Sequence, residues 1–151
     1  MKYVTAGHRY GDMVVPGDIQ QDIIDAITNT NTEPARRSSP KIKTEILDHL
    51  LGAGWSGEVE LDPVSRITIT SAKNKIGLAF QTGNMGRMYA DLLKLQTLYL
   101  RETIKAGLFI VPTYDAAQLL GDNVTNFDRL IKELAIFERA VTVPILIFGF
   151  E

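Results

Sequence analysis

The chain has no cysteine among its 151 residues. Disulfide bonds and thiolate metal sites are therefore excluded, and the composition fits a reducing compartment. No run approaches the roughly 18 apolar residues of a membrane-spanning helix. The first residues, MKYVTAGHRYG, lack the apolar core of a signal peptide. We therefore expect a cytoplasmic protein with no membrane partner.

Several signatures of enzymes and metal sites are also missing. There is no GxSxG elbow, and the segment GNMGRM lacks the spacing, the lysine and the hydroxyl residue of a phosphate-binding loop. The two histidines, His8 and His49, lie too far apart for a metal motif. The net charge of -2 argues against binding of nucleic acid by bulk charge, although a local basic cluster can still bind it.

What the chain does contain is enough apolar sequence for one folded unit. Its 151 residues are 45% hydrophobic, which predicts a single domain over residues 1–151. Apolar periodicity and turn residues predict strands and helices in alternation. The strands are expected at 2–6, 57–61, 67–70, 76–81, 108–111 and 143–150, and the helices at 18–27, 39–51, 85–106, 114–120 and 127–137.

The most informative stretch is ITITSAKNKIGLAFQTG, residues 67–83. It is typical of a hairpin whose arms, 67–70 and 76–81, are joined by a polar turn. A period of two sends the isoleucines, Leu78 and Phe80 to the core and leaves Thr70, Ala79 and Gln81 on the other face. We expect that face to be the working surface of the hairpin.

Two blocks of the sequence resemble type II restriction endonucleases of the BglII and BstYI kind, which belong to the PD-(D/E)xK nuclease superfamily. The segment KNKIGLAFQTGN is similar to their catalytic hairpin, which carries an Asp, a basic turn, then Glu-x-Gln and a Gly. The segment SSPKIKTEILDHLLGAGW is similar to the helix that precedes the catalytic strands in that family. The terminal VPILIFGF also matches the order of elements in that family.

The resemblance implies a fold and a set of active-site positions. The fold would be α/β, with a central mixed β-sheet flanked by helices. The family's Asp position falls on Thr70, its Glu position on Ala79 and its Gln position on Gln81. The preceding helix would lend Thr44 or Glu45. The family acts as a homodimer on duplex DNA, so a homodimer and duplex DNA are the implied partners.

The residues at these positions predict that the chemistry is lost. Phosphodiester hydrolysis of this kind needs hard carboxylate ligands for Mg²⁺, and neither Thr70 nor Ala79 supplies one. We therefore expect a catalytically degenerate protein that binds duplex DNA or a protein partner without cleavage and holds no metal or other cofactor. Two alternatives stay open: an active Mg²⁺-dependent endonuclease with carboxylates relocated to Glu45, Glu58, Glu60 or Asp62, and a dimeric scaffold that binds no DNA.

A local basic cluster is the remaining feature with a chemical meaning. Arg36 and Arg37 lie in a polar loop at 28–39, and Lys41 and Lys43 follow at the start of the next helix. Such a cluster can bind a phosphate backbone, although a solvated linker has the same composition. After the hairpin, Asn84 and Arg87 lie where DNA would approach according to the resemblance.

Overall fold

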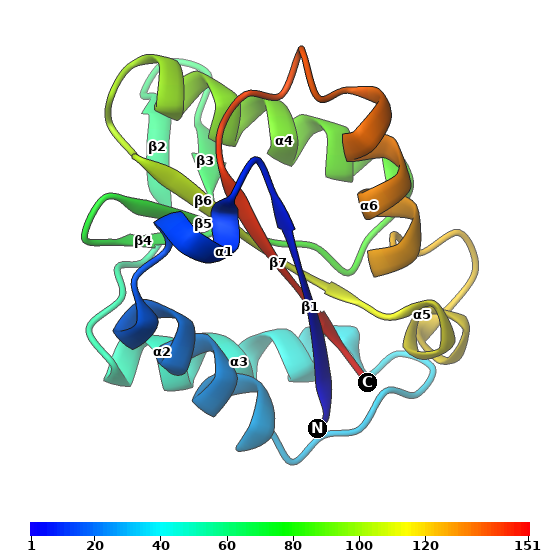
Figure 1. The fold of residues 1–151 in the computed structure, drawn as a ribbon. Coiled ribbons are helices and arrows are strands. Elements are labelled where there is room, and N and C mark those ends of the chain that lie inside the picture. Colours follow the sequence, from blue (N-terminus) through cyan, green and yellow to red (C-terminus); the bar gives the residue numbers. More distant parts are fainter.

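A five-stranded sheet lies at the centre of the computed structural model, which describes residues 1–151 (Figure 1). Its strand order is β1 (Tyr3–His8), β7 (Ile145–Phe150), β6 (Ala106–Pro112), β5 (Ile76–Phe80) and β4 (Ser71–Lys73). The three central strands are parallel, whereas β1 and β4 are antiparallel at the two edges. This arrangement confirms the predicted mixed sheet.

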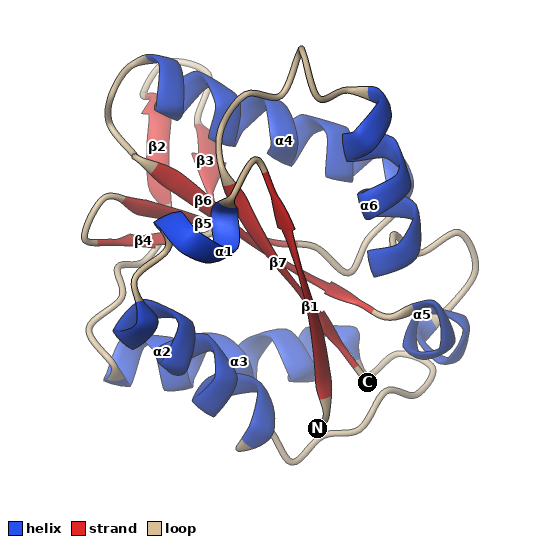
Figure 2. Ribbon diagram, in the orientation of Figure 1, coloured by secondary structure: helices blue, strands red, loops and turns tan.

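Helices cover both faces of the sheet, as predicted (Figure 2). On one face lie α2 (Gly17–Thr28) and α3 (Ser39–Gly52), and on the other lie α4 (Met85–Leu100) and α6 (Phe127–Ile136). Two short helices, α1 (Gly11–Val14) and α5 (Tyr114–Leu120), complete the set. None of the helices is both long and apolar enough to cross a membrane.

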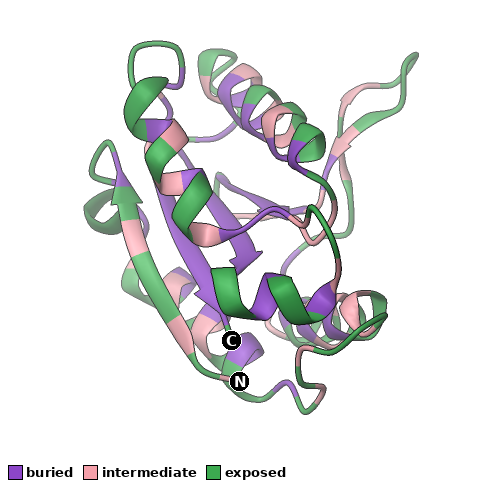
Figure 3. Ribbon diagram, turned by 90° about the vertical axis from the view of Figure 1, so that its right-hand side faces the viewer, coloured by how far each residue is buried: buried purple, intermediate pink, exposed green.

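The core consists of two apolar clusters separated by the sheet. One cluster joins α2 and α3 to Ile76, Leu78 and Phe80, and the other joins α4 and α6 to Ala79 and Phe109. Every residue of β5, β6 and β7 is buried (Figure 3), as expected for parallel strands covered on both faces. Both clusters share one sheet, which supports a single domain over residues 1–151, and that assignment stays a prediction.

The predicted hairpin is wrong in its first arm. Strand β3 (Ile67–Ile69) does not pair with β5 but with β2 (Val59–Asp62), in a separate two-stranded ribbon. The partner of β5 is β4. Asn74 and Lys75 have φ of 50° and 61°, typical of a two-residue hairpin turn, which pairs the residues directly flanking it. The chain therefore changes sheets at Thr70.

One helix boundary was predicted wrongly, and one short helix lies outside the predicted set. Helix α4 ends at Leu100 instead of 106, because Glu102 takes a left-handed φ of 57° and Thr103 N–H returns to the Leu98 carbonyl. Helix α1 was not predicted at all. It passes so close to β7 that a Cβ at Gly11 would lie 2.1 Å from the Ile145 carbonyl carbon, so only glycine permits this crossing.

Candidate nucleic-acid interface

The candidate site lies at the carboxyl ends of β5 and β6. Helices α4, α5 and α6 all begin at this edge of the sheet, on the right-hand side of Figure 1. The side chains of Asn84, Thr113 and Asn126 cap their first turns. In open α/β sheets, ligands bind outside the carboxyl ends of the strands. This edge also carries Gln81, the residue directly after β5.

Thr70 bridges the gap between β3 and β4 and is bonded to β5 at two points. Its N–H donates to the Leu78 carbonyl over 3.1 Å. Its Oγ1 accepts from the Phe80 N–H, also over 3.1 Å. The hydroxyl thus takes the place of a strand carbonyl and extends the β4–β5 pairing by one step. Thr70 therefore has a structural role in the sheet.

Ala79 lies in the core beneath α4. It is 1% exposed and stands beside Phe109 of β6, in the cluster that contains Met88 and Leu92 of α4. The expectation that Ala79 lies on an open working face is therefore wrong. Alternation along β5 was assigned correctly, but α4 covers the second face, which the local pattern alone cannot reveal.

Gln81 belongs to a polar chain that leads from β5 to α4. Its Oε1 accepts from the Gly83 N–H over 2.8 Å, and its Nε2 donates to Asp91 Oδ2 over 2.7 Å. The other oxygen of Asp91 pairs with Lys94 Nζ at 2.8 Å. Both ends of the Gln81 amide are thus occupied, and its orientation is set by α4 and the loop before it.

Glu45 makes its contacts with the loop that precedes α3. Its carboxylate accepts hydrogen bonds from the backbone N–H groups of Asn31 and Thr32 and from the Thr32 hydroxyl. The Thr32 hydroxyl bond is the largest cause of a lowered pKa for Glu45, followed by the Thr32 backbone bond. The carboxylate fastens this loop to α3 and makes no hydrogen bond to Gln81 or Thr70.

Basic residues occur in both helix layers, and the loop before α3 passes close to the first turn of α5 at this edge. Arg36 and Arg37 are exposed in the loop before α3, and Lys41 is exposed in its first turn. Lys43 reaches toward β5, with its Nζ 5.9 Å from the centre of the Phe80 ring. From the other layer, Arg87 lies beside Gly83, where an added Cβ would be 3.2 Å from Arg87 Cδ.

Asn84 has a defined structural role in addition to the predicted one. It is the N-cap of α4, and its Oδ1 accepts from the Arg87 N–H over 3.3 Å. The structure therefore brings Asn84 and Arg87 together next to Gln81, through Gly83.

The other acids considered as relocated ligands lie away from this edge. Asp62 belongs to the β2–β3 ribbon, where its carboxylate accepts from Ser65, which lowers its pKa. Glu58 and Glu60 are exposed on or beside the same ribbon. Across the chain, no three His, Asp or Glu side chains come together in a group that could hold a metal ion.

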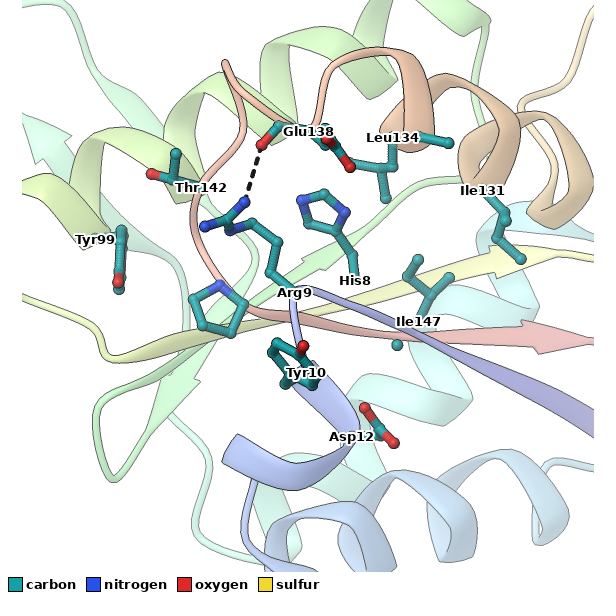
Figure 4. A pocket seen from close by; sticks show the side chains of 13 residues that line it. His8, Arg9, Tyr10, Asp12, Tyr99, Ile131, Leu134, Glu138, Thr142 and Ile147 are labelled. Carbon is teal, nitrogen blue, oxygen red and sulfur yellow. Dashed lines mark hydrogen bonds between the residues drawn. The ribbon is translucent and has the colours of Figure 1, made fainter.

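A separate cavity lies toward the opposite end of the sheet. It has a volume of about 830 Å³ and is lined by the end of β1 and the segment from α6 to β7 (Figure 4). His8, which is 8% exposed, points into this region and contacts the Val141 carbonyl through Nε2 at 2.7 Å. The strand register places His8 level with Gly77, so the cavity is separate from Gln81.

Sequence reasoning missed four residues of the site. Asp91 and Lys94 complete the Gln81 chain, and Arg129 pairs with Glu133 at the start of α6. Their i,i+3 and i,i+4 spacings were visible signals of helix-surface pairs. Their proximity to Gln81 or to the sheet edge depends on how the helices pack, and no local pattern records that.

Comparison with known proteins identifies relatives of the whole fold. The sequence profile of the family described as restriction endonuclease BglII/BglIII matches residues 3–150. No curated protein sequence matches significantly.

Among solved structures, BglII complexed with a DNA 16-mer is similar with a TM-score of 0.89 at 11% identity. That similarity covers 99% of this chain and 76% of the other. Free BglII gives a TM-score of 0.78 at 13% identity, covering 100% and 80%. These similarities confirm the predicted nuclease fold.

Proposed function

The chain belongs to the BglII/BglIII restriction endonuclease family, and from this premise we propose that it binds duplex DNA at the carboxyl edge of its sheet without cleaving it. The proposal has two parts, binding and loss of cleavage, which rest on different observations. Binding rests on the fold and the basic residues. Loss of cleavage rests on the residues around Gln81.

The observation that carries the loss of cleavage is the absence of paired carboxylates around Gln81. Metal-assisted hydrolysis holds Mg²⁺ with hard oxygen ligands, normally including carboxylates. At the positions assigned by the resemblance, Thr70 Oγ1 is bonded to the Phe80 N–H and Ala79 is a buried methyl group. The carboxylate that contacts Gln81, that of Asp91, is paired with Lys94. These residues do not fit a magnesium site.

The binding part is supported by the placement of the basic residues. Arg36, Arg37, Lys41 and Lys43 come from the α2–α3 layer, and Arg87 comes from the α4 layer. They would contact phosphates from both sides of the sheet edge, which is how a protein of net charge -2 can still bind DNA. A complex of BglII with a DNA 16-mer is among the similar structures, which supports this proposal.

The test is incubation with supercoiled plasmid and short duplexes in Mg²⁺ or Mn²⁺, with binding measured in parallel at several salt concentrations. We expect salt-sensitive binding and intact DNA. The charge-removing double variant R36A/R37A should bind more weakly by about tenfold, with a shallower salt dependence. Discrete cleavage would overturn the loss of chemistry, and the absence of binding would overturn the DNA-binding part.

A second candidate, the active endonuclease, is favoured by one observation only. Asp91 of α4 places a carboxylate beside Gln81, paired with the ammonium group of Lys94. In the family the corresponding carboxylate would come from β5. If this arrangement supported cleavage, D91N would abolish it while leaving DNA binding intact. Wild-type protein that fails to cleave in either metal removes this candidate.

We also propose the homodimer that the family implies. Leu93 and Leu100 are 66% and 69% exposed and lie seven residues apart, on one side of α4. A partner copy would cover them. We expect L93E/L100E to shift the protein from dimer to monomer in light scattering, and a wild-type monomer would contradict the dimer. A dimer that binds no DNA would instead favour the scaffold.

A further inference from the structure

Helices α4 and α6 begin side by side at the carboxyl edge and share a sequence pattern. The Thr125 N–H donates to the Gly83 carbonyl over 2.8 Å, and Asn84 forms a β-bridge with Val124. Each helix then has an asparagine N-cap and an arginine three residues later. In α4 these are Asn84 and Arg87; in α6 they are Asn126 and Arg129, with Asn126 Oδ1 accepting from the Arg129 N–H over 3.0 Å.

Arg129 differs from Arg87 because its guanidinium is held in place. Its Nε donates to Glu133 Oε1 over 2.6 Å, one helical turn further along α6. The second oxygen, Glu133 Oε2, is buried without a hydrogen-bond partner, so the pair is not bidentate. The side chain of Arg129 is 49% exposed, whereas that of Glu133 is 16% exposed. The guanidinium is thus fixed through Nε beside Tyr89, and about half of the Arg129 side chain stays exposed to solvent.

The charges of this pair are maintained by their surroundings. Burial acts to raise the pKa of Glu133, but the neighbouring Tyr89 and Arg129 side chains lower it, and the net shift is downward. The pKa of Arg129 is raised, first by Glu133 and then by Tyr89. Glu133 therefore stays ionised at neutral pH and continues to accept the hydrogen bond from Arg129 Nε.

We propose that Arg129 is a phosphate-binding residue for duplex DNA, acting beside Arg87, and that Glu133 is the positioning residue that aims its guanidinium. This inference rests on the proposed DNA binding. The terminal N–H groups of a guanidinium match the geometry of two phosphate oxygens. Holding Nε in advance reduces the rotamer freedom that binding would otherwise remove. The joined starts of α4 and α6 thus present two arginines to one DNA strand.

The test is the salt dependence of duplex binding by the full chain. For R129A we expect affinity to fall about tenfold, and the slope of log K against log salt to lose about 0.9, the value for one phosphate contact. R129K keeps the charge, so the slope should stay while the affinity falls several-fold. R139A is the matched control, because Arg139 is exposed beyond the far end of α6, and its slope should equal that of wild type.

The variant E133Q separates positioning from general electrostatics. Removing a negative charge near DNA would by itself strengthen binding. If Glu133 positions Arg129, E133Q should instead weaken binding several-fold, with the slope unchanged. Melting temperatures of all four variants measure any purely structural effect.

The outcomes distinguish this inference from the proposed function. If wild type binds DNA and R129A keeps the wild-type slope, the phosphate contact is overturned while DNA binding stands. Stronger binding by E133Q would overturn the positioning role. If wild type binds no duplex at any salt concentration, the proposed function fails and this inference fails with it.

Discussion

The two sides of strand β5 have the same burial but different chemistry. On the α2–α3 side, Ile76, Leu78 and Phe80 fill an apolar cluster, with Phe80 packed edge-on against Phe150. On the α4 side, the same strand carries Ala79 and then leads to Gln81, which joins a polar chain to Asp91. Ala79, at the position assigned to the family's Glu, thus contributes to packing, whereas the polar contacts on this side begin at Gln81, at the sheet edge.

The largest effect is expected on the apolar side. Phe80→Ala should lower the free energy of unfolding by about 3–5 kcal/mol, because it removes a ring that is 2% exposed and leaves a cavity. Urea unfolding measures this change. Val64→Ala, at a side chain 91% exposed on the ribbon, is the control and should change stability by less than about 0.5 kcal/mol. A loss below about 1 kcal/mol for Phe80→Ala would contradict the packing described here.

The α4 side is probed by restoring the carboxylates. Ala79→Glu alone should cost about 3 kcal/mol, since it buries a charge beneath α4 without a partner. In the double variant T70D/A79E, added Mg²⁺ should raise the melting temperature, because a ligand that binds only the folded state stabilises it. Wild type should show no such rise. An equal rise in wild type would reveal a metal site that Thr70 and Ala79 do not explain.

The sheet edge can be probed through its helix caps. Asn126→Ala and Asn84→Ala should each cost about 1 kcal/mol, because each removes the side-chain acceptor of a first-turn N–H group. Thermal unfolding measures both. Asn126→Ala should cost more than Asn84→Ala, since the Asn126 cap bond is 3.0 Å long against 3.3 Å and Asn126 is buried. The reverse order would show that cap geometry does not control this edge.

The smallest effect is local and depends on pH. The pKa of Glu45 is lowered by its bonds to Thr32 and Asn31, so the attachment of the loop is complete above the ordinary value of 4.5. It is lost as the pH falls through the lowered value. Amide exchange of Asn31 and Thr32 should therefore speed up in acid, and Glu45→Gln should show fast exchange already at pH 7. Equal exchange in both proteins at pH 7 would contradict this role.

Much of the architecture could be predicted because it depends on the local pattern of apolar residues. Unbroken apolar runs such as VPILIFGF indicated buried strands, and spaced isoleucines indicated α2. The hairpin was assigned to the wrong first arm because Ile67–Ile69 also alternates. In the structure this alternating segment, β3, pairs with β2. The two-residue turn at Asn74 and Lys75 is the local feature that favours pairing of β5 with β4 over pairing with β3.

The candidate site was predictable in part. Gln81, Asn84 and Arg87 were found in one segment and lie together in the structure. Glu45 was also named, but its contacts are with residues 31–32. A carboxylate on a helix surface can accept hydrogen bonds from any neighbouring segment. For Glu45 the three donors come from the loop before α3, at Asn31 and Thr32.

The sequence by itself determined the alternation of strands and helices, the family resemblance and the missing carboxylates, because each depends on residue type and spacing along the chain. Only the tertiary structure decided that Ala79 is buried, that Asp91 meets Gln81, and that Arg129 stands at the same edge as Arg87. Those facts depend on how α4 and α6 pack against the sheet, which brings together residues as far apart in the chain as Gly83 and Thr125.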